Sequence, residues 1–320
     1  MLATAAIARK LRRTRSQRGF VLLLVLGALG LLAVVAATFA HVARNHMRLA
    51  AVAKESARAE ALADAGVNIA ILHLVAARAS QSPDRRFAVD ATPIACSIGG
   101  DGAILTIAVQ DEAGKVDLNI AGEPLLRALV LGLGLSAGEA AVDAILDFRD
   151  EDDDRRVSGA ERADYLAAGR LSGPRNGPFL AVEELGSVLG ITQADADRLR
   201  PFVTIHSGLT AIDTAVAPQG LVEVLARGVR GSPGPLERQA GSSTAMGPGA
   251  ALPPQFLAAS TRRAFFVRSQ ARMPGGATFV REAVVEFVAP SPAAFQVRRW
   301  YRGATAAPDA PAAAQTYPPC

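Results

Sequence analysis

The residues best suited to chemistry lie in one acidic stretch, which runs from Asp147 to Glu161. Counted from Asp150 as the first position, carboxylates fall at positions 1, 3, 5 and 12, which is the spacing of oxygen ligands in an EF-hand calcium loop. Alternation of this kind turns hard oxygen ligands towards one centre, and such ligands suit Ca²⁺ better than softer metals. The sequence therefore predicts a calcium site with these leading ligands: Asp150, Asp152, Asp154 and Glu161.

The loop departs from the EF-hand pattern at its sixth position. Arg155 stands there in place of the glycine that a positive φ favours, so a calcium loop here must have a different backbone geometry. The alternative is a solvated acidic loop that is screened by Arg149, Arg155 and Arg156. Crowded carboxylates repel one another unless a cation neutralises them, and this favours the calcium site.

The chain that positions this loop starts with a basic leader and a long apolar segment. Residues 20–40 have no charge, and as a helix they would span about 31 Å, the thickness of a hydrocarbon core. Residues 1–19 contain six basic residues and no acid, so the excess of positive charge belongs to this leader and predicts a cytoplasmic N-terminus. A cleaved signal peptide is the alternative, although its apolar region is usually only about 7–15 residues long.

The rest of the chain has the patterns of helix and sheet. Helical character continues to about residue 82, and strands are expected at 103–110 and 115–120 as a hairpin about residues 111–114. A meander is expected at 264–272, 278–288 and 296–301. Between the two groups of strands, helical patterns occur at 123–133, 137–149, 160–168, 181–189, 192–200 and 218–227. A long helix on an antiparallel sheet is an α+β fold, and the helical block predicts an inserted all-α domain.

Two smaller features bear on local structure. Ser136 and Thr192 each precede an acidic residue by three positions, which predicts capping boxes at two helix starts. The two cysteines, Cys96 and Cys320, permit one disulfide in an oxidising compartment, and the sequence leaves their pairing open.

Several segments together resemble the type II secretion minor pseudopilin K family. The junction Arg18-Gly19-Phe20 is similar to the class III signal of type IV pilins and pseudopilins, and Leu24 stands where most pilins have Glu but pseudopilin K typically does not. The acidic loop is similar to the family motif D-W-x-D-x-D-D followed by G-A-E, with Phe148 in place of Trp. Further similar segments follow the family order at residues 111–119, 178–185 and 200–204.

The resemblance implies processing and calcium binding. Prepilin peptidase is expected to cleave between Gly19 and Phe20, after which Phe20 is N-methylated. Calcium binding by the helical domain of the family adds these second-rank ligands: Asp147, Asp153 and Asp164.

The resemblance also implies a type IV pilin-like α+β fold, in which a long N-terminal helix packs on an antiparallel sheet that carries a large inserted all-α domain. The expected divisions are a prepilin leader at 1–19, a transmembrane and amphipathic helix at 20–82, the first part of the sheet at 83–120, the inserted domain with its calcium loop at 121–228, a Gly/Ser/Pro-rich linker at 229–254, the second part of the sheet at 255–302 and a disordered tail at 303–320.

The implied function is structural and not enzymatic. A minor pseudopilin of this kind caps the tip of the pseudopilus and helps to initiate its assembly, for the export of folded proteins across the outer membrane. Its expected partners are minor pseudopilins I and J, the major pseudopilin, prepilin peptidase and the inner membrane. The expected location is the bacterial inner membrane, with a single span, a cytoplasmic N-terminus and the bulk of the chain in the periplasm.

A membrane-anchored helix-hairpin-helix protein that binds nucleic acid is the main alternative. Gly186 and Gly190 lie in turns of the kind that hold phosphate in such modules. Residues 137–200 are rich in acids, however, and phosphate binding needs a basic face. An enzyme is not expected, because the sequence has neither a G-x-S-x-G nor an H-E-x-x-H motif.

Overall fold

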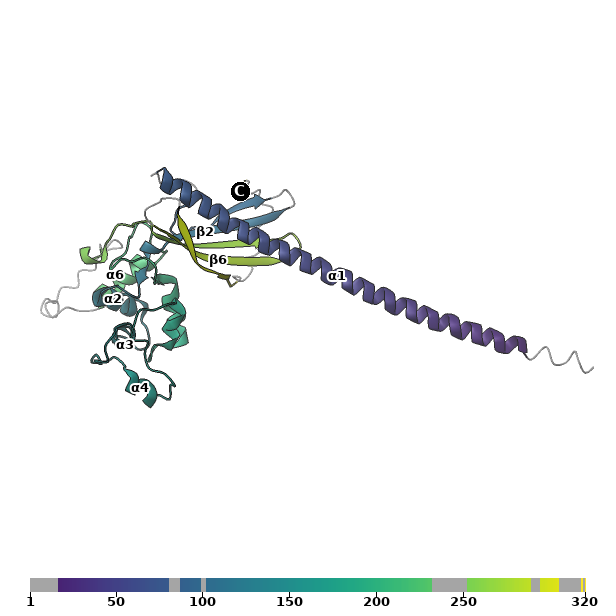
Figure 1. Ribbon diagram of the computed structural model, residues 1–320, viewed down its shortest axis with the longest axis horizontal. Coiled ribbons are helices and arrows are strands. Elements are labelled where there is room, and N and C mark those ends of the chain that lie inside the picture. Colours follow the sequence, from purple (N-terminus) through teal and green to yellow (C-terminus); the bar gives the residue numbers. More distant parts are fainter. Residues whose placement is uncertain are drawn as a thin grey trace, which may run out of the picture. The chain divides into compact units, whose positions relative to one another are not determined.

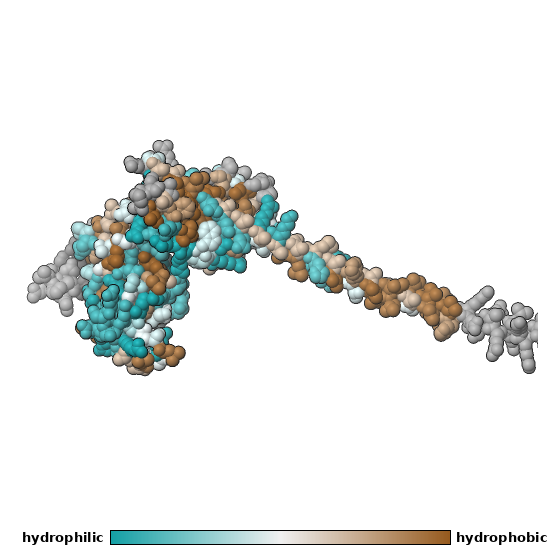
Figure 2. All heavy atoms as spheres, in the orientation of Figure 1, coloured by the Kyte–Doolittle hydropathy of each residue, from teal (hydrophilic) through white to brown (hydrophobic). Residues whose placement is uncertain are grey.

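The computed structural model describes residues 17–80, 87–98, 102–231, 252–288, 294–304, 318 and 320. Helix α1 (Gln17–Ala79) is continuous over 63 residues, and its sequence contains no proline that would break the backbone hydrogen bonding. Within the described chain it is the one helix long and apolar enough to cross a membrane. Figure 2 shows hydrophobic residues along its N-terminal part, and these side chains are exposed. The predicted leader lies almost entirely outside the described residues.

Five strands form one antiparallel sheet in the order β1-β2-β5-β6-β7. Buried and partly buried side chains alternate along β2, so one face of the strand turns towards the core. The predicted meander is confirmed, because the last three strands follow one another in sequence and in space. The strand bounds are β1 (Ile94–Ile98), β2 (Ala103–Asp111), β5 (Ala264–Arg272), β6 (Thr278–Phe287) and β7 (Phe295–Arg302).

The predicted hairpin between residues 103–110 and 115–120 is wrong. Strand β2 pairs with β1 and β5 instead, so both of its edges are already occupied. Residues Glu112–Gly114 form a 3-10 turn, which Asp111 caps by accepting a hydrogen bond from the backbone N–H of Ala113. The chain thereby leaves the sheet, and the short strand β3 (Val116–Asp117) pairs in parallel with β4 (Val203–Thr204).

The C-terminal part of α1 crosses one face of the five-stranded sheet (Figure 1). Ala59, Ala63 and Ala70 are buried there, and their small side chains allow a close approach. Gly66 shows how close the approach is, because a Cβ atom at this position would lie 2.2 Å from Oγ of Ser269 on β5. Burial of this face joins α1, β2, β5 and β6 in one hydrophobic core.

A second hydrophobic core lies in the helical region between β2 and β5. Its α-helices are α2 (Glu123–Leu133), α3 (Ala140–Arg149), α4 (Arg162–Ala167), α5 (Gln193–Leu199) and α6 (Leu221–Gly231). The segment predicted as a helix at 181–189 is a 3-10 helix, η2 (Val182–Ser187), and shorter 3-10 turns lie at η3 (Arg200–Phe202) and η4 (Pro254–Phe256). The packing of α2 against α6 is close, since a Cβ atom on Gly132 would lie 1.9 Å from the carbonyl oxygen of Val224.

One of the two predicted capping boxes is confirmed. The Thr192 side chain accepts from the N–H of Asp195 at 3.1 Å at the start of α5. Ser136 does not cap a helix: α3 begins later, and Ser136 donates instead to the carboxylate of Asp195. The difference arises because the buried carboxylate of Asp195 needs hydrogen-bond donors, and Ser136 and Thr192 both supply one.

The two cysteines form a disulfide that joins β1 to the end of the described chain. Beside the bond, Ser97 exchanges backbone hydrogen bonds with Pro318 and Cys320 at 2.8 and 3.0 Å. The prediction of a disordered tail is therefore wrong for Pro318 and Cys320, and also for Gly303 and Ala304, whose backbones hydrogen-bond to Val280 and Arg268 of the sheet. Residues 305–317 and 319 lie outside the described residues. The linker predicted at 229–254 is wrong at both ends, because α6 continues to Gly231 and Leu252 is buried; residues 232–251 lie outside the described residues.

Candidate calcium site

The acidic loop connects the end of α3 to the start of α4. Asp147 lies in the last turn of α3 with a fully buried side chain, and Asp150 is the residue at which that helix ends. Glu161 precedes the first turn of α4, and its side chain is 6 % exposed. The structure therefore places three carboxylates from two helix ends within one part of the fold.

These three carboxylates carry buried oxygen atoms that lack hydrogen-bond donors. The atoms are Oδ1 of Asp147, Oδ1 of Asp150 and both carboxylate oxygens of Glu161. Buried polar atoms are almost always satisfied in folded proteins, because an unpaired one costs about 1–3 kcal/mol. Four such oxygens in one loop therefore fit a hard cation, which would supply the missing partner.

The raised pKa values of these carboxylates also fit a site for a cation. The pKa of Glu161 is raised to about 7, chiefly by burial and then by the neighbouring charges of Asp147, Asp150, Asp153 and Asp152. Burial also raises the pKa values of Asp147 and Asp150, with smaller opposing effects from Arg156. The positive charge within the loop is therefore too small to compensate its carboxylates.

Gly159 allows the backbone of the loop to approach Asp147. A Cβ atom at position 159 would lie 1.9 Å from Oδ2 of Asp147, so no side chain fits there. The same oxygen accepts a hydrogen bond from the N–H of Arg156 at 3.2 Å, and the Arg156 Nε lies 3.4 Å from Oδ1. The glycine of the G-A-E motif thus lets the chain fold around the buried carboxylate.

The remaining predicted ligands lie on the outside of the loop. Asp152, Asp153 and Asp154 are exposed; Asp152 accepts from the N–H of Asp154, and Asp153 accepts from the side chain of Asn176. Asp164 pairs with Arg155 at 3.1 Å and accepts from the N–H of Glu161 at 2.9 Å, as a cap of α4. Among the described residues, no three His, Cys, Asp or Glu side chains have the arrangement of a formed metal centre.

Segments that are far apart in the sequence support the loop. Phe148 stacks on Phe179 with ring centroids 4.7 Å apart, and Asn119 hydrogen-bonds the backbone of Phe179 in both directions. Arg149 donates to the carbonyls of Leu118 and Ala121. Three of the motif segments noted in the sequence therefore meet at the end of α3, where they fix its position.

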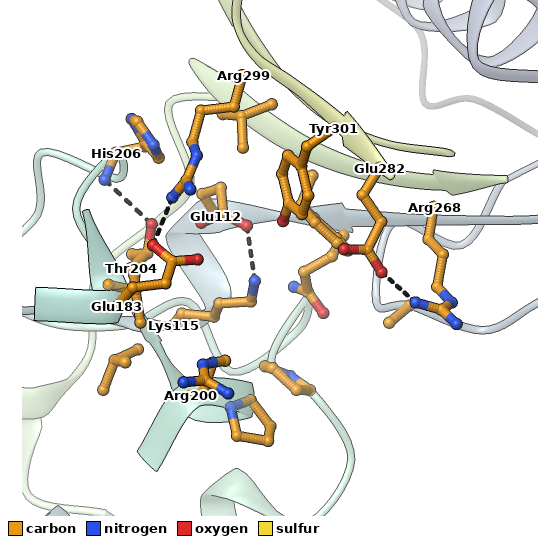
Figure 3. Close-up of a pocket in the computed structure, with 18 of the residues that line it drawn as sticks. Glu112, Lys115, Glu183, Arg200, Thr204, His206, Arg268, Glu282, Arg299 and Tyr301 are labelled. Carbon is orange, nitrogen blue, oxygen red and sulfur yellow. Dashed lines mark hydrogen bonds and ion pairs between the residues drawn. The ribbon is translucent and has the colours of Figure 1, made fainter. Parts of the chain in front are cut away.

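A cavity of about 480 Å³ lies between the sheet and the helical region (Figure 3). Arg299 of β7 reaches across it to Glu183 at 2.9 Å, and Lys115 pairs with Glu112 at 2.7 Å. Burial lowers the pKa of His206 in its wall, which favours the neutral ring. Each described cation of its lining is paired with a carboxylate, so the cavity offers no spare charge to an ionic ligand.

Comparison with known proteins assigns a family to the region that holds the loop. Residues 107–208 match the family model described as type II secretion system (T2SS), protein K. The fold is similar to a chain in the crystal structure of the GspK-GspI-GspJ complex from the type 2 secretion system of enterotoxigenic Escherichia coli. This similarity has a TM-score of 0.53 at 16% identity and covers 82% of this chain and 99% of that one. No curated protein matches the chain.

The two comparisons agree with the order of motifs along the sequence and with the α+β fold of a long helix, an antiparallel sheet and an added helical region. Neither points to the nucleic-acid-binding alternative. The predicted resemblance is therefore confirmed: residues 107–208 match the family model of type II secretion system protein K, and the fold is similar to a chain of the GspK-GspI-GspJ complex.

Proposed function

We propose that this protein is the minor pseudopilin K of a type II secretion system, and that it assembles with minor pseudopilins I and J. The observation that carries the proposal is the match of residues 107–208 to protein K, within a fold similar to a chain of the GspK-GspI-GspJ complex. The role is structural: the protein caps the tip of the pseudopilus and helps to initiate its assembly for the export of folded proteins across the outer membrane.

The proposed anchor is the N-terminal part of α1. Prepilin peptidase cleaves between Gly19 and Phe20, Phe20 is methylated, and the apolar helix then remains as a single span of the inner membrane. The basic leader holds the N-terminus in the cytoplasm and leaves the bulk of the chain in the periplasm. The length and the exposed apolar surface of α1 support this proposal.

Two features favour the tip of the pseudopilus over its shaft. Leu24 stands where most pilins have a glutamate, and a carboxylate that is left unpaired in lipid is costly. The helical region adds five α-helices beside the sheet, and this bulk is expected to clash within a regular fibre of major pseudopilins. A subunit at the tip has no subunit above it, so it needs no carboxylate at position 24 and its helical region has no neighbour there with which to clash.

The proposed cofactor is Ca²⁺, held by the acidic loop. The burial and unpaired oxygens of Asp147, Asp150 and Glu161 rank these three first, ahead of the exposed Asp152, Asp153 and Asp154. Calcium would neutralise the loop and tie the end of α3 to the start of α4. Asp164 is already engaged as a helix cap, which argues against its being a ligand.

The test is co-purification of the full chain with the I and J pseudopilins of the same system. We expect a stable complex from membranes that contain all three, and a fibre in which an affinity label on this chain appears at one end only. The absence of a complex with I and J, or labels spaced along the fibre, would contradict the proposal. A matched sample that lacks prepilin peptidase controls for the membrane-processing step.

A further inference from the structure

One face of the sheet extends beyond the helix that covers it. Strand β7 is an edge strand, and four of its residues lie directly opposite β6 residues: Phe295 opposite Phe287, Val297 opposite Val285, Trp300 opposite Ala283 and Arg302 opposite Arg281. Directly opposite residues of an antiparallel pair point to the same side of the sheet. We call these four β7 residues the β7 stripe; it lies on the face that α1 crosses.

Burial differs sharply between the two strands. Ala283, Val285 and Phe287 of β6 are at most 4 % exposed and share a core with α1. Their partners in the β7 stripe, Phe295, Val297 and Trp300, are 41, 43 and 40 % exposed. The apolar face of the sheet therefore continues past the cover that α1 provides, and adjacent exposed apolar side chains are typical of an interaction surface.

The two strands also carry arginines at matching positions, Arg281 on β6 and Arg302 on β7. Arg281 of β6 donates to Asp64 at 2.5 Å and to Glu60 at 2.8 Å, two carboxylates one turn apart on α1. Its cross-strand neighbour Arg302 lies over the same Phe279 ring, each guanidinium being 4.9 Å from the ring centroid. Among the described residues, no carboxylate pairs with Arg302. The β7 stripe thus repeats the surface that α1 occupies on β6, and no helix of the described chain covers it.

We propose that the β7 stripe binds a helix from another pseudopilin, which lies beside α1 on the sheet. The helix presents two carboxylates at i and i+4 to Arg302, as α1 presents Glu60 and Asp64 to Arg281, and packs small apolar side chains on Val297 and Trp300. Helix α1 contacts β5 at Gly66 and β6 through Glu60 and Asp64, so it lies over both strands. Because packed helices lie about 8–10 Å apart and strands about 4.8 Å apart, a helix next to α1 lies over the edge strand β7.

This inference rests on the proposed function, because it takes the partner to be a pseudopilin of the same system. The test places the photo-crosslinker p-benzoylphenylalanine at Val297 in the full-length chain, co-expressed with minor pseudopilins I and J. Gln296 is the matched control, since it is an exposed neighbour on the opposite face of the same strand. We expect crosslinks from position 297, mapped by mass spectrometry to a helical segment of I or J that carries paired carboxylates, and at least tenfold fewer from position 296.

A charge reversal tests the electrostatic part of the proposal. Arg302→Glu is expected to weaken the binding of the crosslinked partner about tenfold, and reversal of the mapped carboxylates to Lys is expected to restore it. Arg230→Glu, at an exposed position on α6, serves as the control and is expected to leave binding unchanged.

The possible failures are distinguishable. Co-purification of I and J without crosslinks from position 297, or with crosslinks to a strand, a loop or a second copy of this chain, would overturn the proposed surface and leave the proposed function intact. Failure of I and J to co-purify with the unmodified chain would overturn both.

Discussion

Asp147 and Gly159 approach each other so closely that a Cβ atom on Gly159 would lie 1.9 Å from Oδ2 of Asp147. The buried carboxylate therefore fits against the backbone of the loop only because residue 159 has no side chain. This contact links the D-F-R-D motif at the end of α3 to the G-A-E motif that precedes α4, and the loop between them carries the proposed calcium ligands.

The first prediction concerns this contact. Gly159→Ala forces Asp147 or the loop to shift, and we expect calcium affinity to fall at least tenfold and stability to fall by about 1–3 kcal/mol, as in overpacked sites. Titration calorimetry and thermal unfolding of the detergent-solubilised chain measure the two effects. Gly177→Ala is the control, because the nearest atom to its added Cβ is 3.9 Å away. Equal effects of the two substitutions would contradict this role for Gly159.

A second prediction ranks the ligands. Asp147→Asn and Glu161→Gln should each weaken calcium binding tenfold or more, because Oδ1 of Asp147 and both carboxylate oxygens of Glu161 are buried and accept no hydrogen bond. Asp154→Asn should change the affinity less than threefold, since this side chain is exposed. If Asp154→Asn proved the most damaging of the three in calcium titrations, the EF-hand spacing would be the better guide to the ligands.

The third prediction is a pH dependence that calcium removes. The pKa of Glu161 is raised from 4.5 to about 7, so its contribution favours the folded state at low pH and is lost as the pH rises from 4.5 through 7. With EGTA present, the melting temperature of the unmodified chain should fall between pH 5 and pH 8 by more than that of Glu161→Gln. Calcium at pH 8 should restore it; identical pH profiles for the two chains would contradict the assignment.

The fourth prediction concerns the attachment of α1 to the sheet. Arg281 is nearly buried, pairs with Glu60 and Asp64, and lies over the rings of Phe279 and Trp300. Arg281→Ala should lower the stability of the chain by about 1–2 kcal/mol, a value reduced by the partial exposure of both acids. Chemical denaturation measures the loss, with the exposed Arg230→Ala as the control. A change below 0.5 kcal/mol, a typical surface effect, would show that the ion pairs do not hold the helix.

Much of the fold could be predicted from local patterns in the sequence. The helix at Glu123–Leu133 and the meander from Ala264 follow from hydrophobic periodicity and turn residues, which depend on neighbouring positions alone. Strand β1 was not predicted, because it is only five residues long and has no strong alternation. The false hairpin after β2 had the right turn residues, but tertiary pairing with β1 and β5 decided the outcome.

The candidate site, like the fold, could be predicted from the sequence only in part. The acidic residues are obvious in the sequence, yet the spacing ranks the exposed Asp152 and Asp154 above the buried Asp147. Burial depends on how α3 packs against Phe179 and Leu118, segments 31 residues or more away, and no local pattern contains that information. The pairing of Cys96 with Cys320 is of the same kind, since 224 positions separate them.

The most direct test of the central claim, that this protein is a processed pseudopilin, is the mass and sequence of its mature N-terminus in membranes with and without prepilin peptidase. The account predicts a chain that begins at a methylated Phe20 when the peptidase is present and at the unprocessed leader when it is absent. A mature chain that begins at any other residue, or one whose start does not depend on the peptidase, would contradict it.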